Sequence, residues 1–233
     1  MIEEPLSKLR AVVDRAVCQK KSFKVLEAGC GSSTWIPMGP NAYVVGVDIS
    51  EKQLQRNRLL AEKIVGDIQR YVPQKADFDV VICWDVLEHL PHPNQAIHNL
   101  IHSIKPGGIV ILAAPNLYSL KGLLAKFTPY WFHVWVYRHI IGSKDAGTGD
   151  VAPFRTFLRR SMSLPSVERV AKDNGLSVEL SILYESPMNR GAREKYRLVG
   201  WKWHFVKFLV RLLSLGRVDA ECSDWILVLK KTE

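Results

Sequence analysis

Apolar residues recur along the chain in two alternating patterns. Segment 6–20 spaces its apolar residues three to four positions apart, which predicts an amphipathic helix. A polar helix capped by Ser50 is predicted to run through Lys63. A further helix is predicted from Pro93 to about Ile104, where a Lys-Pro-Gly-Gly turn ends it. Short apolar runs predict buried strands at 23–26, 43–47, 64–65, 78–83 and 109–114.

Alternating strands and helices predict a parallel sheet with helices on both faces. The strands are apolar almost throughout, as expected when both faces of a sheet are covered. In such sheets, ligands bind beyond the carboxyl ends of the strands. Polar residues and glycine gather at those ends, at Glu27, Gly29, Asp48, Asp67, Asp85 and Asn116. The pattern therefore predicts a binding site along this edge.

Two stretches exceed what this alternation needs. Residues 117–163 separate the fifth strand from a helix at 164–174, and they hold nine of the 22 aromatic residues. Residues 185–223 separate two strands, 176–184 and 224–230, which a short hairpin would otherwise join. We expect one domain, 1–233, that carries both insertions.

Composition narrows the class of protein. The 233 residues are 47% hydrophobic and 24% charged, which excludes a disordered chain. Four dispersed cysteines without a CxxC motif exclude a disulfide scaffold and favour a reducing, cytoplasmic compartment. His98 and His102 have a spacing that can bind zinc. No third ligand is near them in sequence, so we assign no metal site.

Segment 25–33 (VLEAGCGSS) resembles the first motif of class I S-adenosylmethionine-dependent methyltransferases, an acid followed by Gly-x-Gly. Later landmarks follow in the family's order: Asp48, Asp67, 85–90 (DVLEHL) and 105–108 (KPGG). The DVLEHL segment is most similar to the ubiquinone-type O-methyltransferases. The resemblance implies an α/β fold with a Rossmann-like seven-stranded sheet of order 3-2-1-4-5-7-6. Its last strand would be antiparallel, and 117–163 would form an α-helical lid.

The resemblance also implies S-adenosylmethionine as the cofactor. Glycines at 29 and 31 let the backbone turn sharply beside a ligand, and Glu27 suits a cationic one. Asp48 would accept from the ribose hydroxyls and Asp67 from the adenine amino group. The positions implied to bind the cofactor are Glu27, Gly29, Gly31, Asp48, Ile49, Asp67, Ile68, Cys83 and Trp84.

Departures from neighbouring families sharpen this interpretation. A nicotinamide dinucleotide enzyme would need a third glycine where Thr34 stands, so that rival is disfavoured. Pro37, Gly39 and Pro40 interrupt the helix expected after the glycine turn, which predicts a short helix or a loop there.

Methyl transfer to a hydroxyl requires removal of a proton. His89, His133 and Asp85 are the catalytic candidates, with Glu88 beside them. Some ubiquinone-type relatives use a divalent metal near the acceptor, so metal dependence stays open. Nitrogen or carbon methylation is an alternative to oxygen, and a catalytically idle cofactor-binding or partner protein is another. The acceptor is expected to be a small lipophilic or membrane-associated molecule.

The two insertions suggest where such an acceptor is met. We expect at least half of the aromatic rings in 117–163 to pack on the core, and the rest to line the acceptor pocket. Residues 189–217 contain eight Lys and Arg against one acid, which accounts for most of the net charge of +9. A basic amphipathic helix containing Trp is typical of a peripheral anionic membrane contact. Packing on the domain itself or in a homodimer is the alternative, and nucleic acid is disfavoured because no such motif is visible.

Overall fold

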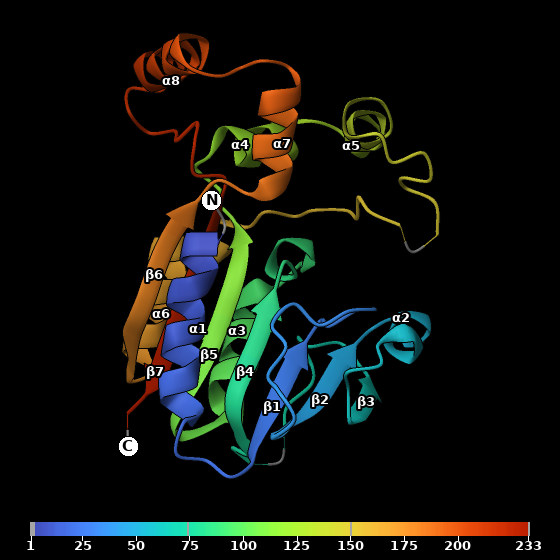
Figure 1. The fold of residues 1–233 in the computed structure, drawn as a ribbon, viewed down its shortest axis with the longest axis vertical. Helices are drawn as coiled ribbons and strands as arrows, with labels where there is room; N and C mark the ends of the chain where they lie inside the picture. Colours follow the sequence, from blue (N-terminus) through green and yellow to red (C-terminus); the bar gives the residue numbers. More distant parts are fainter. Residues whose placement is uncertain (1–2, 74, 150, 233) are drawn as a thin grey trace.

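Runs of aliphatic residues form one mixed sheet. The computed structural model describes residues 3–73, 75–149 and 151–232, and the other positions of the expected 1–233 unit lie outside the described residues. The strands lie in the order β3-β2-β1-β4-β5-β7-β6 (Figure 1). Strands β1 to β5 are parallel, whereas β7 is antiparallel to both of its neighbours. The predicted order and the antiparallel last strand are confirmed. The strands are β1 (Phe23–Ala28), β2 (Ala42–Asp48), β3 (Glu62–Val65), β4 (Phe78–Trp84), β5 (Ile104–Pro115), β6 (Leu176–Tyr184) and β7 (Asp224–Lys231).

Helices cover both faces of the sheet. Helix α1 (Glu3–Val17) buries Leu9 and Val13 against one face. Helices α3 (Pro93–Ser103) and α6 (Leu164–Asp173) pack on the other face. A fully buried aliphatic side chain of this kind contributes about 1.5–3 kcal/mol to the stability of the fold. Because both faces of the sheet are buried, the strands are continuous runs of apolar residues.

Two element boundaries differ from the sequence prediction. Helix α2 (Glu51–Arg56) begins at the predicted Ser50 cap, whose hydroxyl accepts from the Gln53 amide, but it ends well before Lys63. The buried side chain of Asn57 ends it by contacting Thr34 and Leu59 instead of facing solvent. The Lys-Pro-Gly-Gly segment is not a free turn, because β5 already begins at Ile104.

The two long insertions meet above the carboxyl ends of the parallel strands, and we call them together the cap (residues 117–142 and 187–219) (Figure 1). The Leu120 and Asp219 main chains are hydrogen-bonded across it, and Lys195 Nζ donates to the Ile140 carbonyl at 2.8 Å. Segments far apart in sequence thus build one layer. Its elements are α4 (Leu120–Phe127), α5 (Tyr130–Val136), a π-turn (Tyr137–Ile141), α7 (Pro187–Lys195) and α8 (Trp201–Leu213).

The expectation that at least half of the aromatic rings in 117–163 pack on the core is wrong. None of the nine rings, all of which the structure describes, belongs to the buried core. Three of them pack on one another: Phe132 stacks on Trp135 at 5.9 Å, and Trp131 meets Phe132 edge to face. Helices α3 and α6 already cover this face of the core, so the rings stay outside it, seven of them in the cap and Phe154 and Phe157 in the segment that follows.

Candidate active site

The glycine turn after β1 requires glycine at both positions. Gly29 and Gly31 have positive φ angles of 72° and 55°. A Cβ atom at Gly29 would lie 2.4 Å from the Val86 side chain, which follows β4. The Gly29 amide also donates to the Val47 carbonyl at 2.7 Å. The ends of three adjacent strands are therefore packed tightly around this turn, and only glycine fits at its start.

Glu27, the last acid of β1, holds the loop that follows the turn. Its Oε2 accepts from the Thr34 hydroxyl at 2.8 Å, and its Oε1 accepts from the Trp35 amide at 3.2 Å. Only 2% of the residue is exposed, and burial raises the pKa of its carboxyl to about 7. Residues 29–41 contain no helix, as the prolines and glycines there predict.

Asp48 lies beside the same turn. Its Oδ2 accepts from the Gly31 amide and its Oδ1 from the Ser50 amide, each at 2.8 Å. Each oxygen keeps a second lone pair that can accept from a ligand hydroxyl. The neighbouring Ile49 is largely exposed at this edge. The carboxylate therefore orients the turn and can still bind a ribose.

Asp67 follows β3 at the far end of the edge. Its Oδ1 accepts from the Gln69 amide at 2.9 Å, which closes a tight turn. The Ile68 side chain is buried in the core, so Ile68 can face a ligand only through its main chain. That placement is compatible with a cofactor contact made through the Ile68 main chain.

The last two positions of β4 behave differently from each other. The Cys83 side chain is fully buried, and burial raises the pKa of its thiol, so only its main chain can touch a ligand. Trp84 belongs to the opposite face, and its indole stacks on Trp35 with ring centroids 5.9 Å apart. Sequence reasoning missed Trp35, although a large aromatic residue in a loop rich in proline was a visible signal.

A second group of titratable residues follows β4. Asp85 has a positive φ of 53°, an uncommon conformation for a residue other than glycine. His89 Nδ1 lies 2.8 Å from the Arg155 carbonyl, and because a carbonyl only accepts, Nδ1 carries the proton. His89 Nε2 then has a free lone pair, 3.9 Å from Glu88 Oε1. Burial lowers the pKa of His89, so the neutral base persists at physiological pH.

The environment of the carboxyl groups around His89 disfavours their charged forms. Burial raises the pKa of Asp85, and the nearby Glu88 charge adds to the rise. Burial likewise raises the pKa of Glu88. Glu88 Oε2 is buried without a hydrogen-bond partner among the described residues. Such an atom is costly unless a further group satisfies it.

Three residues of this cluster were missed from sequence: Asp224, Lys121 and Tyr137. Asp224 pairs with Lys121 of the cap at 2.7 Å, and its charge acts on both Asp85 and Glu88. Asp224 is the first residue of β7, and because β7 is antiparallel its start lies at the carboxyl edge of the other strands. Tyr137 of the cap faces the same charges, since burial and these carboxylates raise its pKa despite Lys121.

His133 is not part of this cluster. Its Nε2 lies 2.8 Å from the Thr128 hydroxyl on the cap, and burial lowers its pKa. Among the contacts of the described residues, none joins His133 to Asp85, Glu88 or His89. The structure therefore brings together two of the three catalytic candidates.

A metal ion does not fit these residues as they stand. In the described part of the chain, no three His, Cys, Asp or Glu side chains are grouped so as to hold one. His89 Nδ1 is already engaged by the Arg155 carbonyl. We therefore derive no step through a metal.

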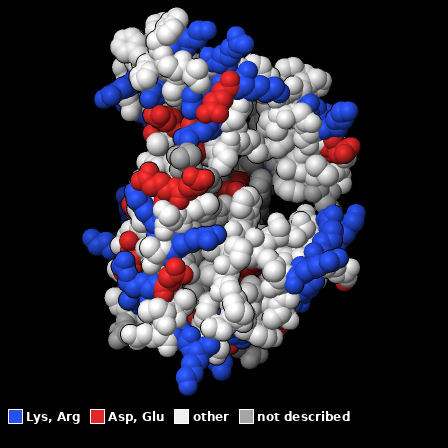
Figure 2. All heavy atoms as spheres, in the orientation of Figure 1, with Lys and Arg blue, Asp and Glu red and all other residues white. Residues whose placement is uncertain are grey.

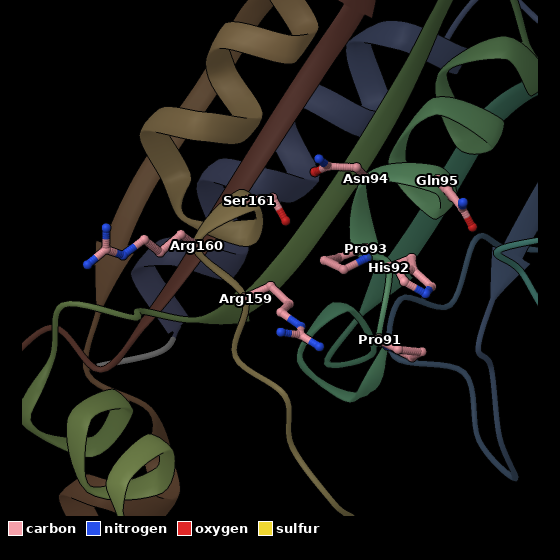
Figure 3. Close-up of a pocket in the computed structure, with 8 residues that line it drawn as sticks. All are labelled: Pro91, His92, Pro93, Asn94, Gln95, Arg159, Arg160 and Ser161. Atoms are coloured by element: carbon pink, nitrogen blue, oxygen red, sulfur yellow. The ribbon is translucent and has the colours of Figure 1, made fainter.

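A hollow of about 570 Å³ opens at the start of α3 (Figure 3). Arg159 extends across it toward the helix, whereas Arg160 extends away. None of the predicted site residues lines it. The lining residues are Pro91, His92, Pro93, Asn94, Gln95, Arg159, Arg160 and Ser161.

The turn of β1 and the carboxylates of β1, β2 and β3 thus lie along one sheet edge and fit a cationic nucleoside without phosphate. The fold and this edge define a Rossmann-like domain that binds S-adenosylmethionine. A family model described as methyltransferase domain matches residues 2–180. The chain therefore belongs to the class I S-adenosylmethionine-dependent methyltransferases, and S-adenosylmethionine is its cofactor.

Curated relatives share part of their length with this chain. A ubiquinone biosynthesis O-methyltransferase of Thiobacillus denitrificans is 30% identical over 182 residues, 74% of this chain and 71% of the relative. One from Azoarcus sp. is 32% identical over 149 residues, 59% of this chain and 60% of the relative. Other such relatives are matched over about half of their length.

Solved structures agree on the fold. A putative S-adenosylmethionine-dependent methyltransferase from Listeria monocytogenes has a TM-score of 0.58 at 14% identity, covering 98% of this chain and 100% of that one. Magnesium protoporphyrin IX methyltransferase from Synechocystis, with bound S-adenosylmethionine, has a TM-score of 0.53 at 17% identity, covering 97% and 79%.

Proposed function

We propose that this protein transfers a methyl group from S-adenosylmethionine to a hydroxyl of a small lipophilic molecule. The observation that carries the proposal is the state of His89, a neutral imidazole with a free Nε2 lone pair at the carboxyl end of β4. The cofactor supplies an electrophilic methyl group when it is bound. The chain must then position the acceptor and take up its proton.

His89 is built for the proton transfer. The Arg155 carbonyl fixes its ring and its tautomer, as an orienting partner does for a general base. Asp85 favours the protonated imidazole electrostatically, which stabilises the charge that develops after transfer. His133 remains a second candidate, from the cap side. Methylation of a hydroxyl releases a proton that such a base can take up, and oxygen is preferred over carbon or nitrogen because the relatives are named O-methyltransferases.

Two kinds of support favour a lipophilic acceptor. The relatives at 30–32% identity are named for ubiquinone biosynthesis and for O-methylation. The cap above the strand ends carries exposed rings, among them Trp131 and Trp135 of α5. We therefore assign the acceptor side to the cap, with 117–163 serving as the lid.

Helix α8 supports delivery from a membrane surface. At 100° per residue, Trp201, Phe205, Phe208 and Leu212 share one face, and all four are exposed. Trp203 and Lys207 turn inward instead: Arg193 lies over the Trp203 ring at 5.0 Å, and Lys207 pairs with Glu221 at 2.9 Å. The helix is thus held by its inner face and presents its apolar face outward.

Basic side chains border this apolar face. Lys202 and Arg211 are exposed beside it, and Lys and Arg gather over this end of the molecule (Figure 2). No described helix is both long and apolar enough to cross a bilayer. An exposed apolar stripe with flanking cations suits the interface of an anionic membrane. We therefore propose peripheral docking through α8, with a homodimer through the same face as the alternative.

The acceptor assignment is tested with S-adenosylmethionine labelled in its methyl group. The panel pairs a prenylated phenol with the matching prenylated aniline and with the phenol lacking its prenyl chain. We expect label in the prenylated phenol, on oxygen. Label on the aniline nitrogen or a ring carbon would contradict O-methylation, and preference for the chainless phenol would contradict the lipophilic class.

A further inference from the structure

The loop that replaces the helix after the glycine turn carries an unusual aromatic pair. Trp35 is 57% exposed, yet its indole stacks on Trp84, which is 6% exposed. The ring planes are inclined by only 19°. One indole therefore lies in the core beneath the sheet edge, while the other extends the same aromatic surface outward.

The backbone under Trp35 is fixed. Glu27 binds the Thr34 hydroxyl and the Trp35 amide, and Asn57 Nδ2 approaches the same Thr34 hydroxyl at 3.5 Å. The next residue, Ile36, is buried in the core. The loop is thus fixed at Thr34 before Trp35 and at Ile36 after it. The Trp35 side chain is therefore held in an exposed position.

The position of this pair relates it to the cofactor. The loop begins at the Gly31 end of the turn, and Trp84 ends β4, the strand next to β1 in the sheet. The buried Glu27 carboxyl lies directly under the loop. The loop covers that carboxyl, so a positively charged ligand on this edge meets the exposed indole face, and Trp is the side chain whose ring attracts cations most strongly.

We propose that Trp35, supported by Trp84, forms a cation–π contact with the sulfonium of S-adenosylmethionine. The same contact is lost with the neutral product S-adenosylhomocysteine, so Trp35 makes the site prefer the charged cofactor and helps release the product. This role concerns the cofactor alone and does not depend on which acceptor is methylated.

Titration calorimetry with both ligands tests the proposal on the purified full-length protein. Trp35→Ala is expected to weaken S-adenosylmethionine about tenfold, the scale of a cation–π contact, and S-adenosylhomocysteine by less than about twofold. Trp35→Phe keeps a ring and should lie between Ala and the wild type. Tyr43→Ala, an exposed aromatic at the opposite end of β2, is the matched control and should leave both affinities unchanged.

The outcomes separate the contact from simple packing. Equal weakening of both ligands by Trp35→Ala would overturn the proposal, because packing does not distinguish charge. Unchanged affinities would also overturn it. Melting curves identify a variant that fails to fold, in which case Trp35→Phe alone decides through the ratio of the two affinities. If the wild type bound neither ligand, the cofactor assignment itself would fail.

Discussion

The cofactor edge and the cap are built in opposite ways. At the cofactor edge the hydrogen bonds join residues that are close in sequence: Glu27 and Trp35 are 8 positions apart, and Asp48 and Gly31 are 17 apart. In the cap, Lys195 to Ile140 spans 55 positions, and Lys121 to Asp224 spans 103. The first region uses main-chain amides and a buried carboxyl, whereas the second uses long side chains that reach across insertions.

This difference separates two functions. The cofactor edge is closely packed and hydrogen-bonded, because Asp48 accepts from the Gly31 and Ser50 amides and a Cβ atom at Gly29 would meet Val86. The cap lies on the surface, and its contacts include stacked rings and the Lys121–Asp224 pair, in which only Asp224 is buried. We infer that binding of a common cofactor is fixed by the first region and the choice of acceptor by the second.

The largest effect is expected from Gly29→Val. A valine at position 29 would have to keep the left-handed backbone conformation of Gly29, and its Cβ atom would clash with the Val86 side chain. Together these should cost about 2–5 kcal/mol of folding free energy and abolish cofactor binding. Gly39→Ala is the matched control: φ is +78° there too, but nothing lies within 4 Å of its Cβ. Urea unfolding and calorimetry measure both effects, and equal costs in the two variants would contradict the close packing at the turn.

The next effect concerns the proposed general base, which follows β4. His89→Ala should lower turnover of the phenol acceptor about 10²-fold or more, while cofactor affinity stays the same. Burial lowers the pKa of His89, so the base stays neutral until the pH is below the usual histidine pKa of about 6.5. The wild-type rate should therefore fall only below that pH. His98→Ala, on the exposed side of α3, is the control. Full turnover by His89→Ala would refute His89 as the general base and leave His133 as the candidate.

A smaller effect is expected at the membrane. Replacing Trp201 and Phe205 by Ser should weaken binding to anionic vesicles by about 2 kcal/mol, close to 30-fold, because two partly inserted side chains are lost. Leu59→Ser, which alters an exposed apolar residue far from α8, should have no effect. Vesicle sedimentation measures this directly. A wild-type protein that stays in the supernatant, or that dimerises through α8, would contradict membrane docking.

The last effect concerns how the stability of the fold depends on pH. Burial raises the pKa of Glu27 to about 7, against roughly 4.3 in an unfolded chain. Between these values the folded protein keeps a proton that the unfolded chain has released. Stability should therefore fall as pH rises from about 4 to 7, by at most about 1.4 kcal/mol per unit from this group. Glu27→Gln should remove that part of the slope in urea unfolding, whereas Asp14→Asn should not.

The same contrast explains what could be predicted from sequence. The sheet order and the glycine turn followed from local patterns and a resemblance, and Ser50 capped its helix as predicted. The early end of α2 did not follow, since it depends on the contact between Asn57 and Thr34 across the turn. The fate of the aromatic rings was misjudged because periodicity cannot show that the core is already closed.

The candidate site divides along the same line. Asp48 and Glu27 could be placed because each lies in the last two residues of an apolar strand. The Lys121–Asp224 pair could not, since it depends on where the antiparallel β7 begins relative to the cap. Trp35 was missed because stacking on Trp84 leaves no spacing pattern in the sequence.

Cofactor binding by Asp48 tests the central claim most directly. Titration of S-adenosylhomocysteine into the wild type and Asp48→Ala should show at least a tenfold loss, because a charge-assisted contact of about 1.5–3 kcal/mol is removed. Asp14→Ala, an exposed acid on α1, should bind like the wild type. Equal affinity of Asp48→Ala and the wild type would contradict the placement of the ribose at the end of β2, and with it the site described above.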